Sequence, residues 1–400
     1  MIKIFPSKLQ GSLIIPPSKS HTLRAILFAA LASGNSTIEH PLSSPDTDAM
    51  IRAVQSLGAK VQIHPHHLTI QGTGGVLTPP DNTIQCGNSG LVLRLIGALA
   101  GLLPHYTILT GDLSLRTRRP IQPLLDGLTQ LGAFATSIQG NVLIKGPLCH
   151  PTASFNGQDS QPVSGLLIAA AFAPHPITLS ISNPGEKPWI DLTLHWFDKL
   201  GIHYQRNGYE SYSLSGNTNI SAFSTTISGD YSSAAFPFAA ALLTQSTLTL
   251  NNLDPADPQG DKAVLSLLPS LPSRIDVNPI IDALPILAVV GCFAEQPTTL
   301  FNGAIARKKE SDRISAIAQE LKKMGARIEE QPDGLTIHPS TLHGAHLDSH
   351  NDHRIALALS VAALAAKSPS HLHNTQCIAK TYPTFFEDLR HLGAHVETLA

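Results

Sequence analysis

The feature that most constrains the fold is an internal repeat of about 70 residues. An apolar, Ala-rich segment followed by a polar turn and a short β-prone segment occurs six times, for example as FAALASGNSTIEH and GALAGLLPHYTILTG. Equivalent positions in the β-prone segments are separated by 70, 71, 69, 52 and 72 residues, and they are Thr37, Thr107, Thr178, Thr247, Thr299 and His371. Such regular spacing predicts repeated supersecondary units that stack and share a core.

A second predicted helix follows in each copy except the fourth, and it ends in Leu-Gly-Ala or a close variant. SLGAKVQIHPHHLTI and KMGARIEEQPDGLTI are examples. The glycine suits a left-handed helix C-cap, and the alternating residues after it suit a hairpin. In the fourth copy LLPSLPSRIDV replaces this element, which accounts for the short interval. Each unit is therefore predicted to be β-α-β-α-β-β.

The ends of the chain indicate how six such units divide into domains. The sixth copy stops at Ala400 with one strand of its hairpin, whereas residues 1–15 carry two strand-like segments without a preceding helix. We expect these N-terminal strands to complete the last repeat. The α/β (α+β) chain would then form a discontinuous domain of 1–17 plus 228–400, holding repeats four to six, and an inserted domain of 18–227, holding repeats one to three. The active site is expected in the interdomain cleft. A continuous division into N-terminal and C-terminal halves is the alternative.

Composition excludes several classes of protein. With 27 Lys and Arg against 29 Asp and Glu, the chain lacks the basic field of a dedicated nucleic-acid-binding protein. The N-terminus lacks the pattern of a secretory signal, no apolar run is long enough to span a bilayer, and the four cysteines are scattered. We expect a soluble, cytoplasmic monomer that binds neither nucleic acid nor membrane. No P-loop, dinucleotide fingerprint or metal-ligand spacing is present, so no cofactor and no metal are expected.

Polar residues stand before the first predicted helix of each copy, where free backbone N–H groups can bind anions. Examples are the segment 17–24 (PSKSHTLR), the segment Gly87-Asn88-Ser89-Gly90 followed by Arg94, and Asp159-Ser160-Gln161. Each also has a structural interpretation, as a turn with an N-cap or as a common loop. Asp282 lies in an apolar stretch and is either an N-cap or a functional carboxylate.

Basic residues gather before the second predicted helices. They are Arg116, Arg118, Arg119, Lys187, Arg307, Lys308, Lys309, Arg313 and Lys380. Cations at a helix start oppose the helix dipole, which favours a role in ligand binding. A solvated helix face with local ion pairs is the alternative for 307–313.

Taken together, these motifs carry a family resemblance that covers the whole chain. The set comprises Pro17-Ser18-Lys19-Ser20, Arg24, Gly87-Asn88-Ser89-Gly90, Arg94, Arg119-Pro120, Ser160-Gln161, Gly229-Asp230, Ser232-Ser233, Lys309-Glu310-Ser311-Asp312-Arg313, Asn351-Asp352-His353-Arg354 and Lys380-Thr381. In this order and spacing the chain resembles the 5-enolpyruvylshikimate-3-phosphate (EPSP) synthases. The resemblance implies a two-domain inverse αβ barrel-like fold with three repeats per domain.

The resemblance also implies a reaction and its ligands. The enolpyruvyl group of phosphoenolpyruvate would pass to the 5-hydroxyl of shikimate 3-phosphate, with release of phosphate, in the shikimate pathway of chorismate and aromatic amino-acid biosynthesis. The residues implied for shikimate 3-phosphate are Lys19, Ser20, Arg24, Ser160, Asp282 and Lys309. The residues implied for phosphoenolpyruvate are Lys19, Gly90, Arg119, Gln161, Arg313, Arg354 and Lys380. Arginine suits the bidentate binding of carboxylate and phosphate groups.

Within this resemblance the catalytic residues are Asp282, Glu310 and Lys19. We expect Asp282 to be the base toward the 5-hydroxyl and Glu310 to protonate the methylene carbon, with Lys19 as the alternative acid. Closure of the domains on the first substrate should expel water. Since Gly90 is retained, the chain is also expected to be a target of the inhibitor glyphosate.

Four positions depart from the family pattern. Leu91 stands where a small Ser or Thr is common, and Asp159 where Ser or Ala is common. Glu186 and Trp189 replace the usual Ser and Tyr around Lys187-Pro188, beside the expected position of the substrate phosphate.

Two other functions fit part of the pattern. One is the related enolpyruvyl transferase acting on UDP-N-acetylglucosamine, although the loop LSLRTRRP lacks the reactive cysteine usual there. The other is an inactive anion-binding paralogue, against which the retention of Asp282 and Glu310 argues.

Overall fold

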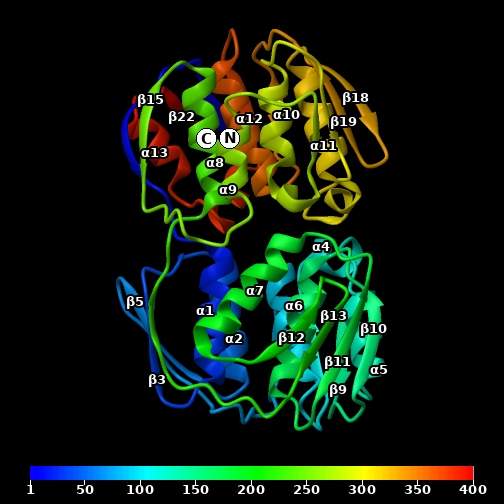
Figure 1. Cartoon of the computed structure of the whole chain (residues 1–400). Helices are drawn as coiled ribbons and strands as arrows, with labels where there is room; N and C mark the ends of the chain where they lie inside the picture. Colours follow the sequence, from blue (N-terminus) through cyan, green and yellow to red (C-terminus); the bar gives the residue numbers. More distant parts are fainter. Residues whose placement is uncertain (400) are drawn as a thin grey trace. The chain divides into compact units, whose positions relative to one another are not determined.

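The computed structural model describes residues 1–399, and the chain divides into two compact units. Unit 1 is Met1–Pro16 together with Ser228–Ala400, and unit 2 is Pro17–Ile227. Each unit has its own hydrophobic core. Figure 1 shows helices and strands in both units.

Unit 2 contains repeats one to three. Repeat one consists of β14 (Ser224–Thr226), α1 (Lys19–Leu31), β3 (Asn35–Glu39), α2 (Pro45–Ser56), β4 (Lys60–Ile63) and β5 (His67–Gln71). Repeat two consists of β6 (Ile84–Gln85), α3 (Gly90–Ala100), β7 (Thr107–Thr110), α4 (Leu113–Thr117), α5 (Gln122–Gln130), β8 (Phe134–Ile138) and β9 (Asn141–Lys145). Repeat three consists of β10 (Thr152–Asn156), α6 (Ser160–Phe172), β11 (Ile177–Ser182), α7 (Lys187–Leu200), β12 (Tyr204–Asn207) and β13 (Ser211–Leu214).

Unit 1 contains repeats four to six. Repeat four consists of β2 (Gln10–Ile14), α8 (Tyr231–Leu243), β15 (Thr247–Asn251) and α9 (Lys262–Leu267). Repeat five consists of β16 (Arg274–Asp276), η1 (Asn278–Ala283), α10 (Leu284–Gly291), β17 (Thr298–Phe301), η2 (Ala304–Lys308), α11 (Arg313–Lys323), β18 (Arg327–Gln331) and β19 (Gly334–His338). Repeat six consists of β20 (His346–Asp348), α12 (His353–Ala365), β21 (Ser370–His373), η3 (Thr375–Lys380), α13 (Phe385–His391), β22 (Val396–Thr398) and β1 (Ile2–Ile4).

Five of the sheets share one topology, which confirms the predicted βαβαββ repeat. The first strand of each repeat pairs in parallel with the second, and the hairpin adds antiparallel to the second strand, as in the orders β6-β7-β9-β8 and β10-β11-β13-β12. Repeat four has only the parallel pair β15-β2. Its hairpin is missing, as the substitution of LLPSLPSRIDV for that element predicts.

The N-terminal strands do not both complete the last repeat. β1 does so, because it pairs antiparallel with β21 and β22. The prediction was wrong for β2, which pairs in parallel with β15 and serves as the first strand of repeat four. The strand that precedes α8 in the chain, β14, pairs with β3 of repeat one instead. Because β14 belongs to the sheet of repeat one, β2 takes the place of the first strand in the sheet of repeat four.

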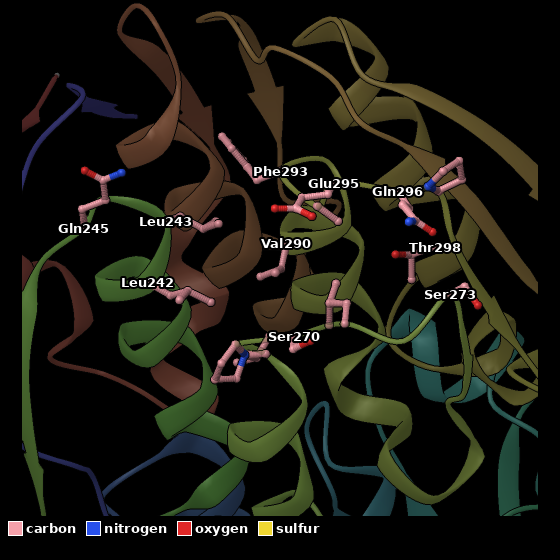
Figure 2. A pocket seen from close by; sticks show the side chains of 15 residues that line it. Leu242, Leu243, Gln245, Ser270, Ser273, Val290, Phe293, Glu295, Gln296 and Thr298 are labelled. Carbon is pink, nitrogen blue, oxygen red and sulfur yellow. The ribbon is translucent and has the colours of Figure 1, made fainter.

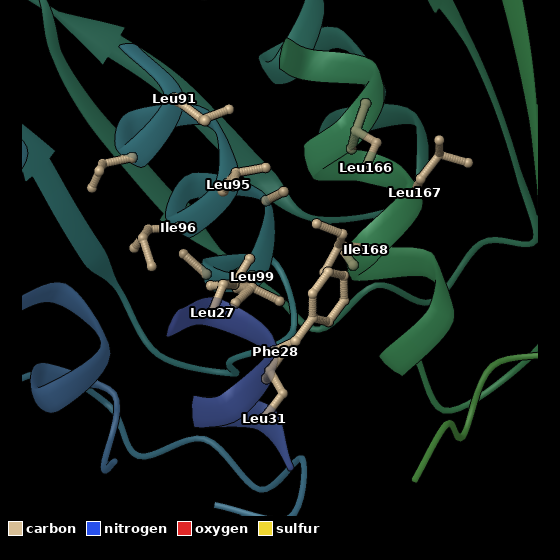
Figure 3. Close-up of a cluster of buried hydrophobic side chains, with 14 of the residues drawn as sticks. Leu27, Phe28, Leu31, Leu91, Leu95, Ile96, Leu99, Leu166, Leu167 and Ile168 are labelled. Carbon is tan, nitrogen blue, oxygen red and sulfur yellow. The ribbon is translucent and has the colours of Figure 1, made fainter. Parts of the chain in front are cut away.

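Most of the Ala-rich helices are buried almost all round, which explains the weak amphipathic pattern of all of them except α3. In unit 2, side chains of α1, α3 and α6 form the cluster in Figure 3, including Leu27, Leu95, Leu99 and Leu166. A Cβ atom at Gly165 would lie 2.7 Å from the carbonyl oxygen of Arg94, so α3 and α6 approach closely. In unit 1, α8, α10 and α12 pack against one another (Figure 1). No helix within residues 1–399 is long and apolar enough to cross a membrane.

A groove of about 720 Å³ in unit 1 is lined in part by the segment that replaces the fourth hairpin (Figure 2). Its lining includes Leu242 and Leu243 at the end of α8, Ser270 in the segment before β16, and Phe293 after α10. None of the predicted site residues lines this groove.

Candidate active site

In unit 2, the segment that begins α1 uses its polar residues in two ways. Ser18 is the N-cap, and its hydroxyl accepts a hydrogen bond from the backbone N–H of His21 at 3.4 Å. The Lys19 ammonium lies 3.6 Å from Oδ2 of Asp46, which also accepts a hydrogen bond from the Ser89 hydroxyl at 2.9 Å. Asp46 therefore joins the start of α1 to the N-cap of α3.

Arg24 is buried one turn after Ser20 on α1. Its guanidinium donates to the hydroxyl of Thr193 at 3.0 Å and to the carbonyl oxygens of Ser20 and Trp189 at 3.2 and 3.3 Å. These partners are all neutral oxygen atoms. Burial lowers the pKa of Arg24 to about 9. An anionic ligand beside this guanidinium would stabilise its charged form.

At the start of α3, Gly90 faces three polar side chains. A Cβ atom there would lie 2.5 Å from Nη1 of Arg119, 2.9 Å from Nη1 of Arg94 and 3.1 Å from Oε1 of Gln161. The structure thus brings together Gly90, Arg119 and Gln161, three residues predicted to bind phosphoenolpyruvate. Leu91, which departs from the family pattern, packs into the core of unit 2 and is 8% exposed.

At the start of α6, two acidic side chains take the backbone N–H groups. Asp159 is the N-cap and accepts from the N–H of Gln161 at 3.0 Å. Oε2 of Glu186 accepts from both the N–H and the hydroxyl of Ser160, at 3.0 and 2.8 Å. Asp159 also lies 3.8 Å from Nε of Arg94. Two of the four departures from the family pattern, Asp159 and Glu186, therefore place carboxylates at this helix start.

In unit 1, the Asp282 carboxylate lies between two arginines. Oδ1 accepts from Nη1 of Arg313 at 2.6 Å, and Oδ2 accepts from Nη2 of Arg354 at 3.3 Å. Asp282 belongs to η1, and the helix that follows has Ala283 as its N-cap. The alternative that Asp282 serves as an N-cap is therefore wrong.

Glu310 extends the same network. Its Oε2 accepts from Nη2 of Arg313 at 2.9 Å, and its Oε1 accepts from the Lys380 ammonium at 2.6 Å. Five of the six predicted site residues of unit 1 are therefore linked by ion pairs, namely Asp282, Glu310, Arg313, Arg354 and Lys380. Lys309, the sixth, precedes Glu310 directly and is half-buried.

Asp352 is a further member that sequence reasoning did not single out. Its side chain is fully buried and accepts from Nε of Arg313 at 2.8 Å, from the Ser311 hydroxyl at 3.0 Å and from the N–H of Arg354 at 2.9 Å. Burial alone would lower the pKa of Arg313, but the carboxylates of Asp352, Glu310 and Asp282 raise it well above its usual value. Asp352 stands directly before α12, inside the motif Asn351-Asp352-His353-Arg354. This position is the feature of the sequence that could have identified it.

Arg354 combines burial with unused hydrogen-bonding capacity. Nε and Nη1 are buried and make no hydrogen bond to any described residue. Its guanidinium also lies 5.9 Å from the ring centre of Phe236, within the range of a cation–π contact. A buried donor without a partner is costly unless a ligand binds it.

The expectation that the basic clusters begin helices was wrong for several residues. Arg116 lies in the last turn of α4, Arg307 and Lys308 in that of η2, and Lys380 in that of η3. Short helical segments precede the second helices, and cations near a helix C-terminus complement the dipole. Arg307 pairs with Asp312 and Glu330 at 2.8 and 2.9 Å.

Comparison with known proteins places this arrangement in a family. The family model of EPSP synthase (3-phosphoshikimate 1-carboxyvinyltransferase) matches residues 5–389. The 3-phosphoshikimate 1-carboxyvinyltransferase of Chlamydia felis is 45% identical over 99% of this chain and 94% of its own length. That of Chlamydia muridarum is 46% identical over 98% and 95%.

Solved structures give the same result for the fold. An EPSP synthase from Acinetobacter baumannii superposes with a TM-score of 0.81 at 26% identity, covering 99% of both chains. The enolpyruvyl transferase NikO from Streptomyces tendae has a TM-score of 0.78 at 19% identity, over 100% of this chain and 99% of its own. Because the family model and the relatives span both units, the chain belongs to the EPSP synthase family.

Proposed function

We propose that the protein transfers the enolpyruvyl group of phosphoenolpyruvate to the 5-hydroxyl of shikimate 3-phosphate and releases phosphate. The reaction would supply chorismate and aromatic amino-acid biosynthesis. The observation that carries the proposal is the network around Arg313, in which buried cations and carboxylates alternate. Such a network suits a reaction that needs both anion binding and proton transfer, in a chain of this family.

We propose that residues of each unit bind the substrate anions. The two substrates carry roughly five negative charges, which a desolvated site must offset. In unit 2 the proposed ligands are Lys19, Ser20, Arg24, Gly90, Arg119, Ser160 and Gln161. In unit 1 they are Asp282, Lys309, Arg313, Arg354 and Lys380. Nε and Nη1 of Arg354 support a role of this residue in binding phosphoenolpyruvate, because the oxygen atoms of that substrate would accept the hydrogen bonds that these buried groups do not make within residues 1–399.

Proton transfer is assigned to the two carboxylates of unit 1. Asp282 takes the proton of the 5-hydroxyl as that oxygen forms a bond to C2 of phosphoenolpyruvate. Each carboxylate oxygen has a second lone pair, so Asp282 can accept this proton while it remains bonded to Arg313 and Arg354. Glu310, or Lys19 as the alternative acid, gives a proton to the methylene carbon. Loss of a proton from the resulting methyl group and departure of phosphate then restore the double bond.

A phosphate-release assay tests the proposal. The purified protein is mixed with phosphoenolpyruvate and shikimate 3-phosphate, and inorganic phosphate is measured. We expect release that depends on both substrates. Tight binding of shikimate 3-phosphate without phosphate release would indicate an inactive anion-binding paralogue. Phosphate release only when UDP-N-acetylglucosamine replaces shikimate 3-phosphate would indicate the other transferase.

We further propose that the protein acts as a cytoplasmic monomer. The family is biosynthetic, and its substrates are small anions. Light scattering coupled to size exclusion should give a mass near 42.5 kDa, and a mass twice that value would contradict the monomer.

A further inference from the structure

The start of α6 has few donors left for an external anion. The N–H of Ser160 donates to Glu186 and that of Gln161 donates to Asp159, both at 3.0 Å. The third residue of the helix is Pro162, which has no N–H. Two carboxylates of the chain itself therefore hold the N–H groups that a helix start commonly offers to a phosphate.

Glu186 is directed to this position by its backbone. It is the residue before α7, yet its side chain makes no capping bond to that helix. Its φ and ψ angles are 46° and 40°, in the left-handed region that residues other than glycine rarely adopt. The residue is 1% exposed, and its carboxylate binds the N–H and hydroxyl of Ser160 on the neighbouring helix.

We propose that Glu186 is a specificity-determining residue that competes with the substrate phosphate for Ser160. This inference rests on the proposed function, in which Ser160 contacts shikimate 3-phosphate. A phosphate can bind the hydroxyl and N–H of Ser160 only after the carboxylate has left them, because two anions cannot share these donors without strong repulsion. The apparent affinity for the substrate is therefore expected to be lower than the site would give without Glu186.

The same competition affects the two forms of the ligand differently. Shikimate 3-phosphate has to displace Glu186 to reach Ser160, whereas shikimate, which has no phosphate, can bind while Glu186 stays on Ser160. Glu186 therefore lowers the affinity for the phosphorylated substrate while it keeps Ser160 bonded in the free enzyme.

Three variants test this inference by steady-state kinetics. Glu186→Ser removes the carboxylate and restores the residue usual in the family, and Glu186→Gln keeps the size and an acceptor oxygen but removes the charge. The matched control is Glu210→Ser, which removes one negative charge of the same unit from the exposed turn before β13. We expect the KM for shikimate 3-phosphate to fall about tenfold in Glu186→Ser and several-fold in Glu186→Gln. In the two Glu186 variants, the KM for phosphoenolpyruvate at saturating shikimate 3-phosphate should stay within about twofold of the wild type. In the Glu210→Ser control, the KM for shikimate 3-phosphate should stay within the same range.

Calorimetric titration of shikimate 3-phosphate in the absence of phosphoenolpyruvate gives a second readout, which does not need turnover. The Kd should fall in parallel with the KM. An unchanged or raised Kd in both folded Glu186 variants would overturn the inference and indicate a purely structural cap. Failure of the proposed function is a separate outcome, since wild-type protein would then release no phosphate whatever the Glu186 variants do.

Discussion

Oδ1 of Asp282 lies 2.6 Å from Nη1 of Arg313, so the proposed base contacts an arginine proposed to bind phosphoenolpyruvate. The same arginine binds Glu310, the proposed acid, through Nη2. One buried guanidinium thus positions both carboxylates. Proton transfer and anion binding are therefore expected to respond differently to substitutions around Arg313.

Replacing the base should separate these two functions. Asp282→Ala removes the proton acceptor, and we expect turnover to fall at least about 100-fold, because a positioned acid or base contributes about 10²–10⁴-fold. Binding of shikimate 3-phosphate should weaken far less than turnover, because its other proposed ligands, among them Arg24 and Ser160, remain. Phosphate release gives kcat, and calorimetry gives the substrate Kd. Near-normal turnover would refute the assignment of Asp282 as the base.

Asp352 is expected to act as a positioning residue for Arg313. Asp352→Asn keeps a good N-cap for α12 but removes the charge that binds Nε of Arg313. We expect the KM for phosphoenolpyruvate to rise about tenfold, as hydrogen bonds between charged groups contribute about 1.5–3 kcal/mol. Asp352→Ala should add a loss of roughly 1 kcal/mol of stability from the missing cap. Equal KM values in the wild type and Asp352→Asn would exclude the positioning role.

The sequence predicts much of this architecture because the repeat is written in local patterns. Helix C-cap glycines, alternating hairpins and the degenerate fourth copy all follow from residues close in the chain. The place of β2 does not, because it depends on β14 pairing with β3 about 190 residues away in sequence. Residues 10–14 have the same strand pattern whichever sheet they join.

In the candidate site, too, some features can be predicted from residues close in the chain, whereas others depend on contacts between distant residues. The polar residues before α1, α3 and α6 stand next to the helices that they start, so their clustering is visible in the sequence. The bonds of Glu186 to Ser160 and of Asp352 to Arg313 join residues 26 and 39 positions apart. They depend on tertiary packing and on the left-handed backbone at Glu186, neither of which has a local signature.

Gly90 offers a test of how closely ligands and arginines pack at α3. A Cβ atom there would lie 2.5 Å from Nη1 of Arg119, so Gly90→Ala must displace this guanidinium. The KM for phosphoenolpyruvate and the inhibitory concentration of glyphosate should both rise, while the helix itself gains a better helix former. Gly97→Ala is the matched control on α3, because its Cβ atom would meet only apolar side chains, Leu124 and Ile144. Wild-type activity that stays constant up to millimolar glyphosate would contradict the predicted sensitivity.

Asp261 is expected to make stability depend on pH. Its carboxyl group is fully buried, and Oδ1 makes no hydrogen bond within residues 1–399. Burial, and next the negative charge of Asp282, raise its pKa to about 7. In the unfolded chain an aspartic acid loses its proton near pH 3.9.

The sign of the effect follows from proton binding. Between about pH 4 and pH 7 the folded state retains a proton on Asp261 that the unfolded state has lost, so the free energy of unfolding decreases as the pH rises through this window. Asp261→Asn has no such proton to lose. The melting temperature of Asp261→Asn minus that of the wild type, measured by scanning calorimetry, should therefore increase from about pH 5 to pH 8. In an Asp282→Asn background the increase should shrink, because a neighbouring negative charge that raises the pKa of Asp261 is gone. Parallel pH profiles for the wild type and Asp261→Asn would show that Asp261 loses its proton at the same pH in the folded and unfolded states.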